Sequence, residues 1–138
     1  YQSDGVNFLW CRLPSGRLLS YPKPRWEPYT TPWGAERVGP TFQTHHKPAA
    51  GEPPLRNHLR GALLFQNTVQ AVAADILRTA LLEADRAGLH IVAHVHDEII
   101  GSGCDGDKLN KIMLKNPVWA DGLPLATGGV VTGQRWGK

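Results

Sequence analysis

Residues 65–100 have the sequence FQNTVQAVAADILRTALLEADRAGLHIVAHVHDEII, which divides into parts of different periodicity. From Phe65 to Ala87, apolar residues recur at the i, i+3, i+4 and i+7 spacing of an amphipathic helix. Gly88 follows at the position where a left-handed glycine commonly ends a helix. Leu89 to Val95 is then apolar on both faces, which is typical of a central strand. The stretch predicts a long helix, a tight stop and a buried strand.

The apolar strand is interrupted at His96, Asp97 and Glu98. If the strand continued, Asp97 would share a face with the apolar residues before it, and burying an unpaired carboxylate costs several kcal/mol. Because Ile99 and Ile100 are apolar again, we expect a β-hairpin with His96 and Asp97 at its tip. Both residue types tolerate positive φ, but the pair lacks the usual glycine, so the turn is expected to be strained.

Before this stretch, turn-forming prolines and glycines are more frequent. Phe8 to Leu13 and Arg17 to Tyr21 flank the turn residues Pro14-Ser15-Gly16, which predicts an N-terminal β-hairpin. From Pro22 to Pro54, prolines and glycines recur so often that we expect an irregular, extended arm.

The residues after the central hairpin predict short elements only. Asp105 or Asp107 is placed to cap a short helix. Short strands are expected around Leu123 to Ala126 and Val130 to Thr132. The whole predicts an α+β fold, in which a small antiparallel sheet bearing the Asp97 hairpin packs on the long helix.

Composition and charge suggest two regions. With 138 residues, 41% hydrophobic and 20% charged, the chain has the size and composition of one globular domain or a piece of a larger one. Its net charge of +3 arises from about +4 in residues 1–64, a basic hairpin and arm, and −1 in residues 65–138. A basic region beside a slightly acidic one suits a polyanionic partner, although such a charge is also common on solvated surfaces.

Targeting signals and cysteine frameworks are missing from the sequence. No apolar run approaches the ~20 residues of a membrane span, and the first residues do not resemble a signal peptide. Cys11 and Cys104 have no CxxC partner, so we expect reduced thiols. These features predict a soluble, intracellular protein without membrane association.

Motifs along the chain resemble those of family A (DNA polymerase I-like) DNA polymerases of the phage and prophage type. Val95 to Ile99, VHDEI, at a hairpin tip after a helix, is similar to motif C of that family. The other similar segments are QAVAAD at 70–75, LWCRLPSGR at 9–17, Tyr21-Pro22 and GQRW at 133–136. The resemblance implies a partial polymerase palm, with residues 65–138 as its C-terminal portion and motif C, acting in the cytoplasm of a bacterial or phage-infected cell.

The resemblance also implies roles for single residues. In that family two carboxylates hold a pair of Mg²⁺ ions, and Asp97 matches one of them. Mg²⁺ requires hard oxygen ligands, which explains the residue type. Glu98 matches an auxiliary acid near the metals, and His96 matches a residue that touches the primer terminus. Gln70 matches a helix position that contacts the minor groove of the primer-template, where shape is read.

The chain also departs from the family pattern. Nothing before residue 65 resembles the strand of the other catalytic carboxylate, and Asp4 has no strand leading into it. The fingers helix with its Lys and Tyr is missing, and no basic residue stands near Leu63, where the phage branch carries one. We therefore expect a portion of a polymerase that is inactive alone and needs the N-terminal polymerase portion, in the same or a separate chain. Its partners would be primer-template DNA and, in the complete enzyme, dNTP, with Mg²⁺ bound weakly or not at all by this portion.

Basic residues interleave with aromatic ones in the first 26 positions. They can follow a phosphate backbone, or they can be ordinary surface residues of a hairpin. The candidates for primer-template binding in this segment are Arg12, Arg17, Lys23 and Arg25, beside Trp10, Tyr21 and Trp26.

Two other functions remain open from the sequence. His94 and His96, at i and i+2, could form the zinc site of a hydrolase together with Asp97. Alternatively, the chain could be a non-catalytic nucleic-acid-binding module. A metal titration separates the three: zinc held by histidines indicates the hydrolase, weak Mg²⁺ at Asp97 the polymerase, and DNA binding without metal the module.

Overall fold

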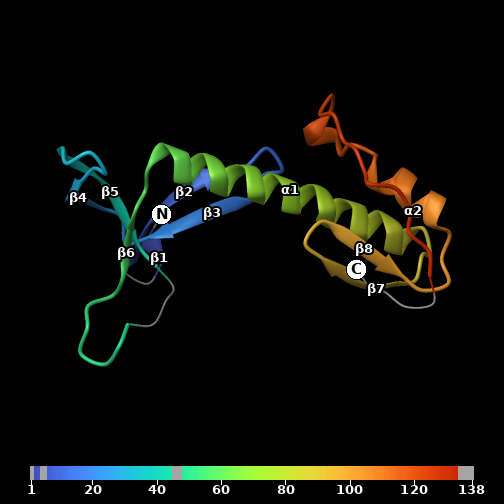
Figure 1. Ribbon diagram of the computed structural model, residues 1–138, viewed down its shortest axis with the longest axis horizontal. Helices are drawn as coiled ribbons and strands as arrows, with labels where there is room; N and C mark the ends of the chain where they lie inside the picture. Colours follow the sequence, from blue (N-terminus) through green and yellow to red (C-terminus); the bar gives the residue numbers. More distant parts are fainter. Residues whose placement is uncertain (1, 4–5, 45–47, 134–138) are drawn as a thin grey trace. The chain divides into compact units, whose positions relative to one another are not determined.

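The computed structural model describes residues 2–3, 6–44 and 48–133. Residues 134–136 of the predicted terminal motif lie outside this description. The chain separates into two compact units, Tyr1–Val69 (unit 1) and Gln70–Lys138 (unit 2). The predicted division between residues 64 and 65 stays a prediction. The elements in chain order (Figure 1) are β1 (Gln2–Ser3), β2 (Val6–Arg12), β3 (Leu18–Pro22), β4 (Arg25–Thr30), β5 (Glu36–Gln43), β6 (Arg56–His58), α1 (Gly61–Arg86), β7 (Ile91–Val95), β8 (Glu98–Gly101), α2 (Gly106–Met113) and the 3-10 turn η1 (Val118–Ala120).

The long helix α1 confirms the helical periodicity, but it begins at Gly61, four residues before the predicted start. It ends in a Schellman motif. Gly88 has φ 74° and donates its N–H to Asp85 O at 2.9 Å, while Leu89 N–H donates to Ala84 O at 3.0 Å. The motif turns the chain back onto the helix, because Ala84 and Leu89 are both buried in one cluster.

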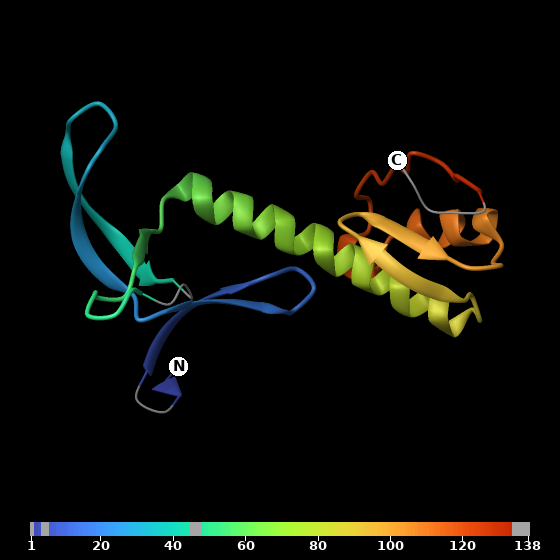
Figure 2. The same cartoon turned by 60° about the horizontal axis from the view of Figure 1, so that its bottom comes forward.

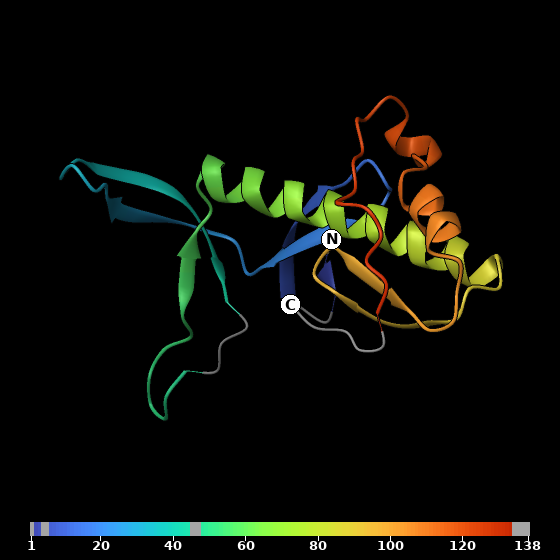
Figure 3. The same cartoon turned by 45° about the vertical axis from the view of Figure 1, so that its right-hand side comes forward.

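The core of unit 2 is small and apolar. Ala84, Leu89 and Leu109 form its buried centre. Side chains from the hairpin and from α2, including Ile91, Ile99 and Ile112, pack against them. The hairpin and α2 therefore both pack on the last turns of α1 (Figure 3). This confirms the predicted α+β arrangement, in which a small antiparallel sheet packs on the long helix.

Strands β7 and β8 form the predicted two-stranded hairpin. Val95 pairs with Glu98, so that His96 and Asp97 alone make the turn. One irregularity was not predicted: Ile91 pairs with Gly101 but Ala93 pairs with Ile100, which leaves Val92 as a bulge. The bulge shifts the alternation of side chains along β7, so residues before and after Val92 do not alternate between the two faces in one register.

The end of unit 2 is partly as predicted. Asp105 caps α2, accepting a hydrogen bond from Lys108 N–H at 3.1 Å. The short strands expected at Leu123 to Ala126 and Val130 to Thr132 were wrong, since neither segment is a strand. The second segment packs instead: Gly106 lies so close to Val130 that a Cβ at residue 106 would meet the valine methyl at 2.5 Å.

Unit 1 contains the predicted N-terminal hairpin, β2 and β3, extended by β1. Gly16, with φ 87°, supplies the turn, and Leu13 N–H donates to Arg17 O at 2.8 Å. One face of the hairpin packs on the first turns of α1. Tyr21 is 4% exposed there, and its hydroxyl accepts a hydrogen bond from Asn67 at 3.4 Å.

The predicted irregular arm, Pro22 to Pro54, was wrong for residues 25–43, because β4 and β5 pair there and β6 completes a three-stranded antiparallel sheet in the order β4-β5-β6 (Figure 2). Residues 48–54 contain no strand, as predicted. Pro28 and Pro40, which suggested an irregular chain, are compatible with the hydrogen-bond ladder between β4 and β5. The pairs Trp26–Pro40 and Pro28–Val38 are two positions apart, so both prolines occupy the same class of pair. In an antiparallel ladder every second pair exchanges no hydrogen bonds, and that class needs no N–H. On the side of β6, the Pro40 carbonyl accepts a hydrogen bond at 2.7 Å from the N–H of Leu59, the residue that follows β6.

Candidate functional site

The hairpin tip of unit 2 presents the predicted catalytic residues to solvent. His96, Asp97 and Glu98 are all exposed. His96 has φ 54°, one of two non-glycine residues with positive φ in the described chain. This conformation is costly for a residue with a Cβ, so the predicted strain in the turn is present. The tip holds a carboxylate free of the core, at the end of strands whose other residues anchor it.

The described residues do not form a complete metal site. Carboxylate oxygens of Asp97 and Glu98 are the kind of ligand that Mg²⁺ requires. However, no three His, Cys, Asp or Glu side chains of residues 2–3, 6–44 and 48–133 gather as a metal-binding group. The donor type therefore fits Mg²⁺ and the number of donors does not. The zinc hypothesis for His94, His96 and Asp97 also lacks the required cluster of ligands.

The helix motif at residues 70–75 places its two polar residues in different environments. Gln70 is exposed on α1 and free to meet a ligand. Asp75 is 7% exposed and lies 3.4 Å from Arg78, one turn along the helix. Asp75 is thus a buried carboxylate within the fold, whereas Gln70 is accessible as the predicted DNA contact requires.

Two of the predicted basic contacts lie in the N-terminal hairpin. Arg12 is exposed on β2, and by strand alternation it shares a face with Phe8 and Trp10, whose ring centroids are 5.3 Å apart. Arg17 is half-buried at the start of the returning strand. The aromatic and basic residues of β2 therefore do share a face, which is the opposite one from that packed on α1.

The other two basic candidates, Lys23 and Arg25, lie at the junction of β3 and β4. Both side chains are exposed. Their backbones have structural roles: Lys23 has φ 48° and its N–H donates to Asn7 O at 2.8 Å, and the Arg25 carbonyl accepts from Thr41 at 3.3 Å. Binding of DNA by either side chain stays a prediction.

A polar hub centred on Arg56 joins the strands of the second sheet. Its guanidinium donates to Glu27 Oε2 at 3.1 Å, to Thr41 Oγ1 at 2.7 Å and to Lys23 O at 2.8 Å. Thr41 is 1% exposed and donates in turn to Glu27 at 2.8 Å. The pKa of Glu27 is lowered, mainly by the hydrogen bond from Thr41 and also by the charge of Arg56. Burial acts in the opposite direction and has a smaller effect than the Thr41 hydrogen bond.

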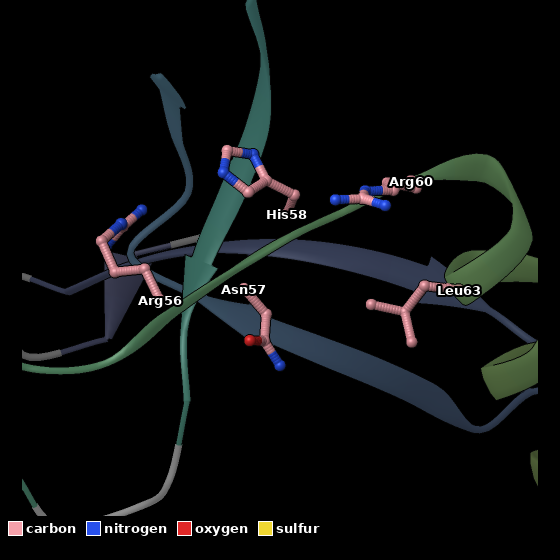
Figure 4. A pocket seen from close by; sticks show the side chains of 5 residues that line it. All are labelled: Arg56, Asn57, His58, Arg60 and Leu63. Atoms are coloured by element: carbon pink, nitrogen blue, oxygen red, sulfur yellow. The ribbon is translucent and has the colours of Figure 1, made fainter. Parts of the chain in front are cut away.

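Beside the hub lies an open hollow of about 340 Å³ (Figure 4). Arg60 is exposed, and its guanidinium carbon lies 5.6 Å from the centroid of the Tyr29 ring. The His58 ring lies 4.7 Å from the same ring, and its buried Nδ1 has no hydrogen-bond partner among the described residues. The lining residues are Arg56, Asn57, His58, Arg60 and Leu63.

Comparison with known proteins relates the chain to a polymerase. It is 38% identical over 128 residues to a DNA polymerase of Bacillus phage SP02. The alignment includes 90% of this chain and 19% of that polymerase, so the chain spans about a fifth of its relative. No protein-family model and no solved structure matches. The similarity supports a relationship to DNA polymerases in general.

The residues around the hollow are absent from the sequence-based candidates. Arg56 and Arg60 were not singled out because the segment before them, from Pro22 to Pro54, was expected to be irregular, so no sheet was predicted that would position them. The usable signal was the alternation of residues 25–29, in which charged or polar side chains occupy odd positions. Within the described residues, no helix has both the length and the apolar character needed to cross a membrane.

Proposed function

We propose that this chain is the C-terminal palm portion of a family A, phage-type DNA polymerase, and that Asp97 is one of its two catalytic carboxylates. The observation that carries the proposal is the two-residue turn that holds Asp97 in solvent at the end of a packed hairpin, next to the exposed Glu98 at the start of β8. The 38% identity to a phage DNA polymerase over most of the chain supports it independently.

In this proposal Asp97 is a Mg²⁺ ligand and Glu98 an auxiliary acid. A pair of Mg²⁺ ions about 3.5–4 Å apart stabilises both the attacking and the leaving oxygen of a phosphoryl transfer. Because the described residues supply too few ligands for such a pair, the remaining ones come from polymerase residues outside this sequence. The dNTP-binding surface comes from the same missing portion.

The other candidates position the DNA. His96 lies beside Asp97 in the turn, where it can meet the primer terminus. Gln70, exposed on α1, contacts the minor groove of the primer-template. The basic side chains that follow the phosphate backbone are Arg12, Arg17, Lys23 and Arg25.

The test is Asp97→Asn in the complete polymerase. Incorporation of a single nucleotide should fall by at least about 10²–10³-fold, because a charged ligand is lost at the point where charge develops. Binding of primer-template, followed by fluorescence anisotropy, should hardly change because the phosphate contacts remain. The control is Asp121→Asn, which removes an exposed carboxylate that follows η1 in the same unit. Normal turnover by Asp97→Asn would refute the role of Asp97.

The 138-residue chain alone provides a second test. It should not extend a primer, and activity should return only when a polypeptide with the missing palm strand and fingers is added. Template-dependent extension by the chain alone, lost again in Asp97→Asn, would contradict the requirement for a further portion.

A further inference from the structure

The second sheet of unit 1 has a basic face and a more apolar one. Cross-strand pairs share a face, and the pairs Tyr29–Arg37 and Arg25–Thr41 place both arginines and the Tyr29 ring on one side. The pair Trp26–Pro40 and the pair Pro28–Val38 place their side chains on the other side. Glu27, the acidic residue of strand β4, belongs to the basic face but is bound to Arg56 and Thr41.

Two hollows on this unit share Arg60. The first is the 340 Å³ hollow described above. The second has a volume of about 140 Å³ and combines two aromatic with two cationic side chains. No acidic residue lines either hollow. The second is lined by Tyr29, Thr31, Pro32, Trp33, Arg37 and Arg60.

The cations of these hollows differ in their partners. Arg56 is engaged by a carboxylate, a hydroxyl and a carbonyl oxygen, so its charge is compensated and its position fixed. Arg37 and Arg60 are exposed and form no ion pair within the part of the chain that the structure describes. Arg60 lies over the Tyr29 ring, which holds a guanidinium without neutralising it. Two uncompensated positive charges therefore flank the second hollow.

The aromatic side chains complement these charges. The Tyr29 ring lies close to Gly39, where a Cβ would meet the ring carbon Cε1 at 2.9 Å. Trp33, in the turn between β4 and β5, is 77% exposed. A tryptophan ring left this open beside two free arginines offers a stacking surface next to phosphate-binding groups. Proteins that bind single-stranded nucleic acid combine these two features.

We propose that the two hollows form a binding site for single-stranded nucleic acid, with phosphates at Arg37 and Arg60 and a base stacked on Trp33. Under the proposed polymerase function, on which this reading of its role rests, the strand is an unpaired part of the DNA substrate. A duplex fits less well, because its bases are already stacked and expose only their edges. An acidic protein segment could pair with the two arginines, but it would not need the open Trp33 ring that lies with them in the second hollow.

The experiment measures binding of a fluorescein-labelled 15-nucleotide oligo-dT to the 138-residue chain by anisotropy. Trp33→Ala should weaken binding about tenfold, the effect expected for loss of one stacked base. Trp26→Ala removes a tryptophan that is 73% exposed on the other face of the sheet and should leave the affinity unchanged. Quenching of tryptophan fluorescence by the oligonucleotide should fall in Trp33→Ala and persist in Trp26→Ala. Trp33→Phe, which keeps a ring at this position, should keep most of the affinity.

The charge is tested by salt dependence. Arg60→Gln should weaken binding and lower the slope of log K against log salt by about 0.7, the value for one phosphate contact on a single strand. Arg86→Gln, an exposed arginine of the other unit, should change neither. Equal behaviour of Trp33→Ala and Trp26→Ala, tighter binding of a duplex of the same length, or no oligonucleotide binding would overturn the proposal. The last outcome is expected if the surface instead binds a protein.

The two proposals can fail separately. Asp97→Asn should leave oligo-dT binding intact, because the carboxylate lies in unit 2 and the measurement needs no catalysis. Normal incorporation by Asp97→Asn together with loss of binding in Trp33→Ala would remove the polymerase role and retain the nucleic-acid site. Loss of incorporation with no effect of Trp33→Ala or Arg60→Gln would do the reverse.

Discussion

The two units of the chain are stabilised by different interactions. In unit 2 the buried centre consists of apolar side chains, Ala84, Leu89 and Leu109. Unit 1 also buries Leu13, Tyr21 and Leu59, but its most buried side chain is that of Thr41, which lies within a network of hydrogen bonds centred on Arg56. Apolar packing in unit 2 does not depend on direction, so the exposed turn at its edge can be tolerated. The hydrogen bonds of Arg56 in unit 1 depend on direction, so they fix the strands of a sheet whose faces remain accessible. The candidate functional surfaces follow this difference: a strained tip on unit 2 and a basic face on unit 1.

Leu109→Ala should give the largest effect on stability. The side chain is 8% exposed, and its loss from the core of unit 2 should lower the free energy of unfolding by about 2–5 kcal/mol. Leu82→Ala, at a residue 58% exposed, should change it by no more than about 0.5 kcal/mol. Native-state hydrogen exchange should show lost protection in β7 and β8 with protection retained in β4–β6. Equal loss in both would show that the two units unfold together.

Arg56→Ala should have the opposite effect and destabilise unit 1 rather than unit 2. It removes the guanidinium that donates to Thr41 and to Glu27 and leaves only the hydrogen bond from Thr41 to Glu27, which should lower the free energy of unfolding by about 1.5–3 kcal/mol. Amide protection should fall in β4–β6 first. The matched control is Arg86→Ala, which breaks only an exposed ion pair with Glu83 and should change the free energy by about 0.5 kcal/mol or less. Equal effects of the two variants would contradict the role of the hub.

Gly88→Ala tests the backbone device that turns the chain into the core of unit 2. A Cβ at φ 74° meets no neighbouring atom within 4 Å, so any cost is conformational and should be about 1–2 kcal/mol. Gly61→Ala, at the start of the same helix, also meets no atom and lacks the positive φ. It should be neutral or stabilising, by up to about 1 kcal/mol. Thermal unfolding monitored by circular dichroism separates the two, and similar shifts would argue against the Schellman ending.

Acid should produce the smallest effect and should act on unit 1. The folded-state pKa of Glu27 is lowered, so its contribution to stability is present above its unfolded pKa and is lost as the pH falls through the folded value. Glu27→Gln should therefore reduce the loss of stability between pH 6 and pH 3, measured by urea unfolding. Glu36→Gln removes an exposed carboxyl group outside the hub and serves as the control. An identical acid profile for wild type and Glu27→Gln would exclude a role for this carboxylate.

Local patterns predicted the long helix and the hairpin of unit 2 well because neighbours in sequence specify these elements, but they wrongly predicted strands in its last residues, 123–126 and 130–132. The helical period, the glycine at residue 88 and the polar break at His96 and Asp97 each determine a local conformation. They were less successful where pairing is non-local. Prolines in β4 and β5 suggested irregular chain, since their register in a ladder depends on partners more than ten residues away. The residues that line the two hollows escaped prediction for the same reason, because His58 and Arg60 meet Tyr29 only after the sheet has formed.

Because His96 has a positive φ, selection for stability and selection for catalysis should favour different residues at this position. A screen that scores only expression or melting temperature would favour glycine or asparagine there, because either relieves the left-handed turn. A screen that scores nucleotide incorporation would retain the imidazole if it meets the primer terminus. A saturation library sorted in both ways would therefore give opposed preferences at residue 96 and similar ones at Ile99, whose side chain serves only the core. The conformational cost of the left-handed turn would thus be detected as a difference between the residues preferred for folding and those preferred for catalysis.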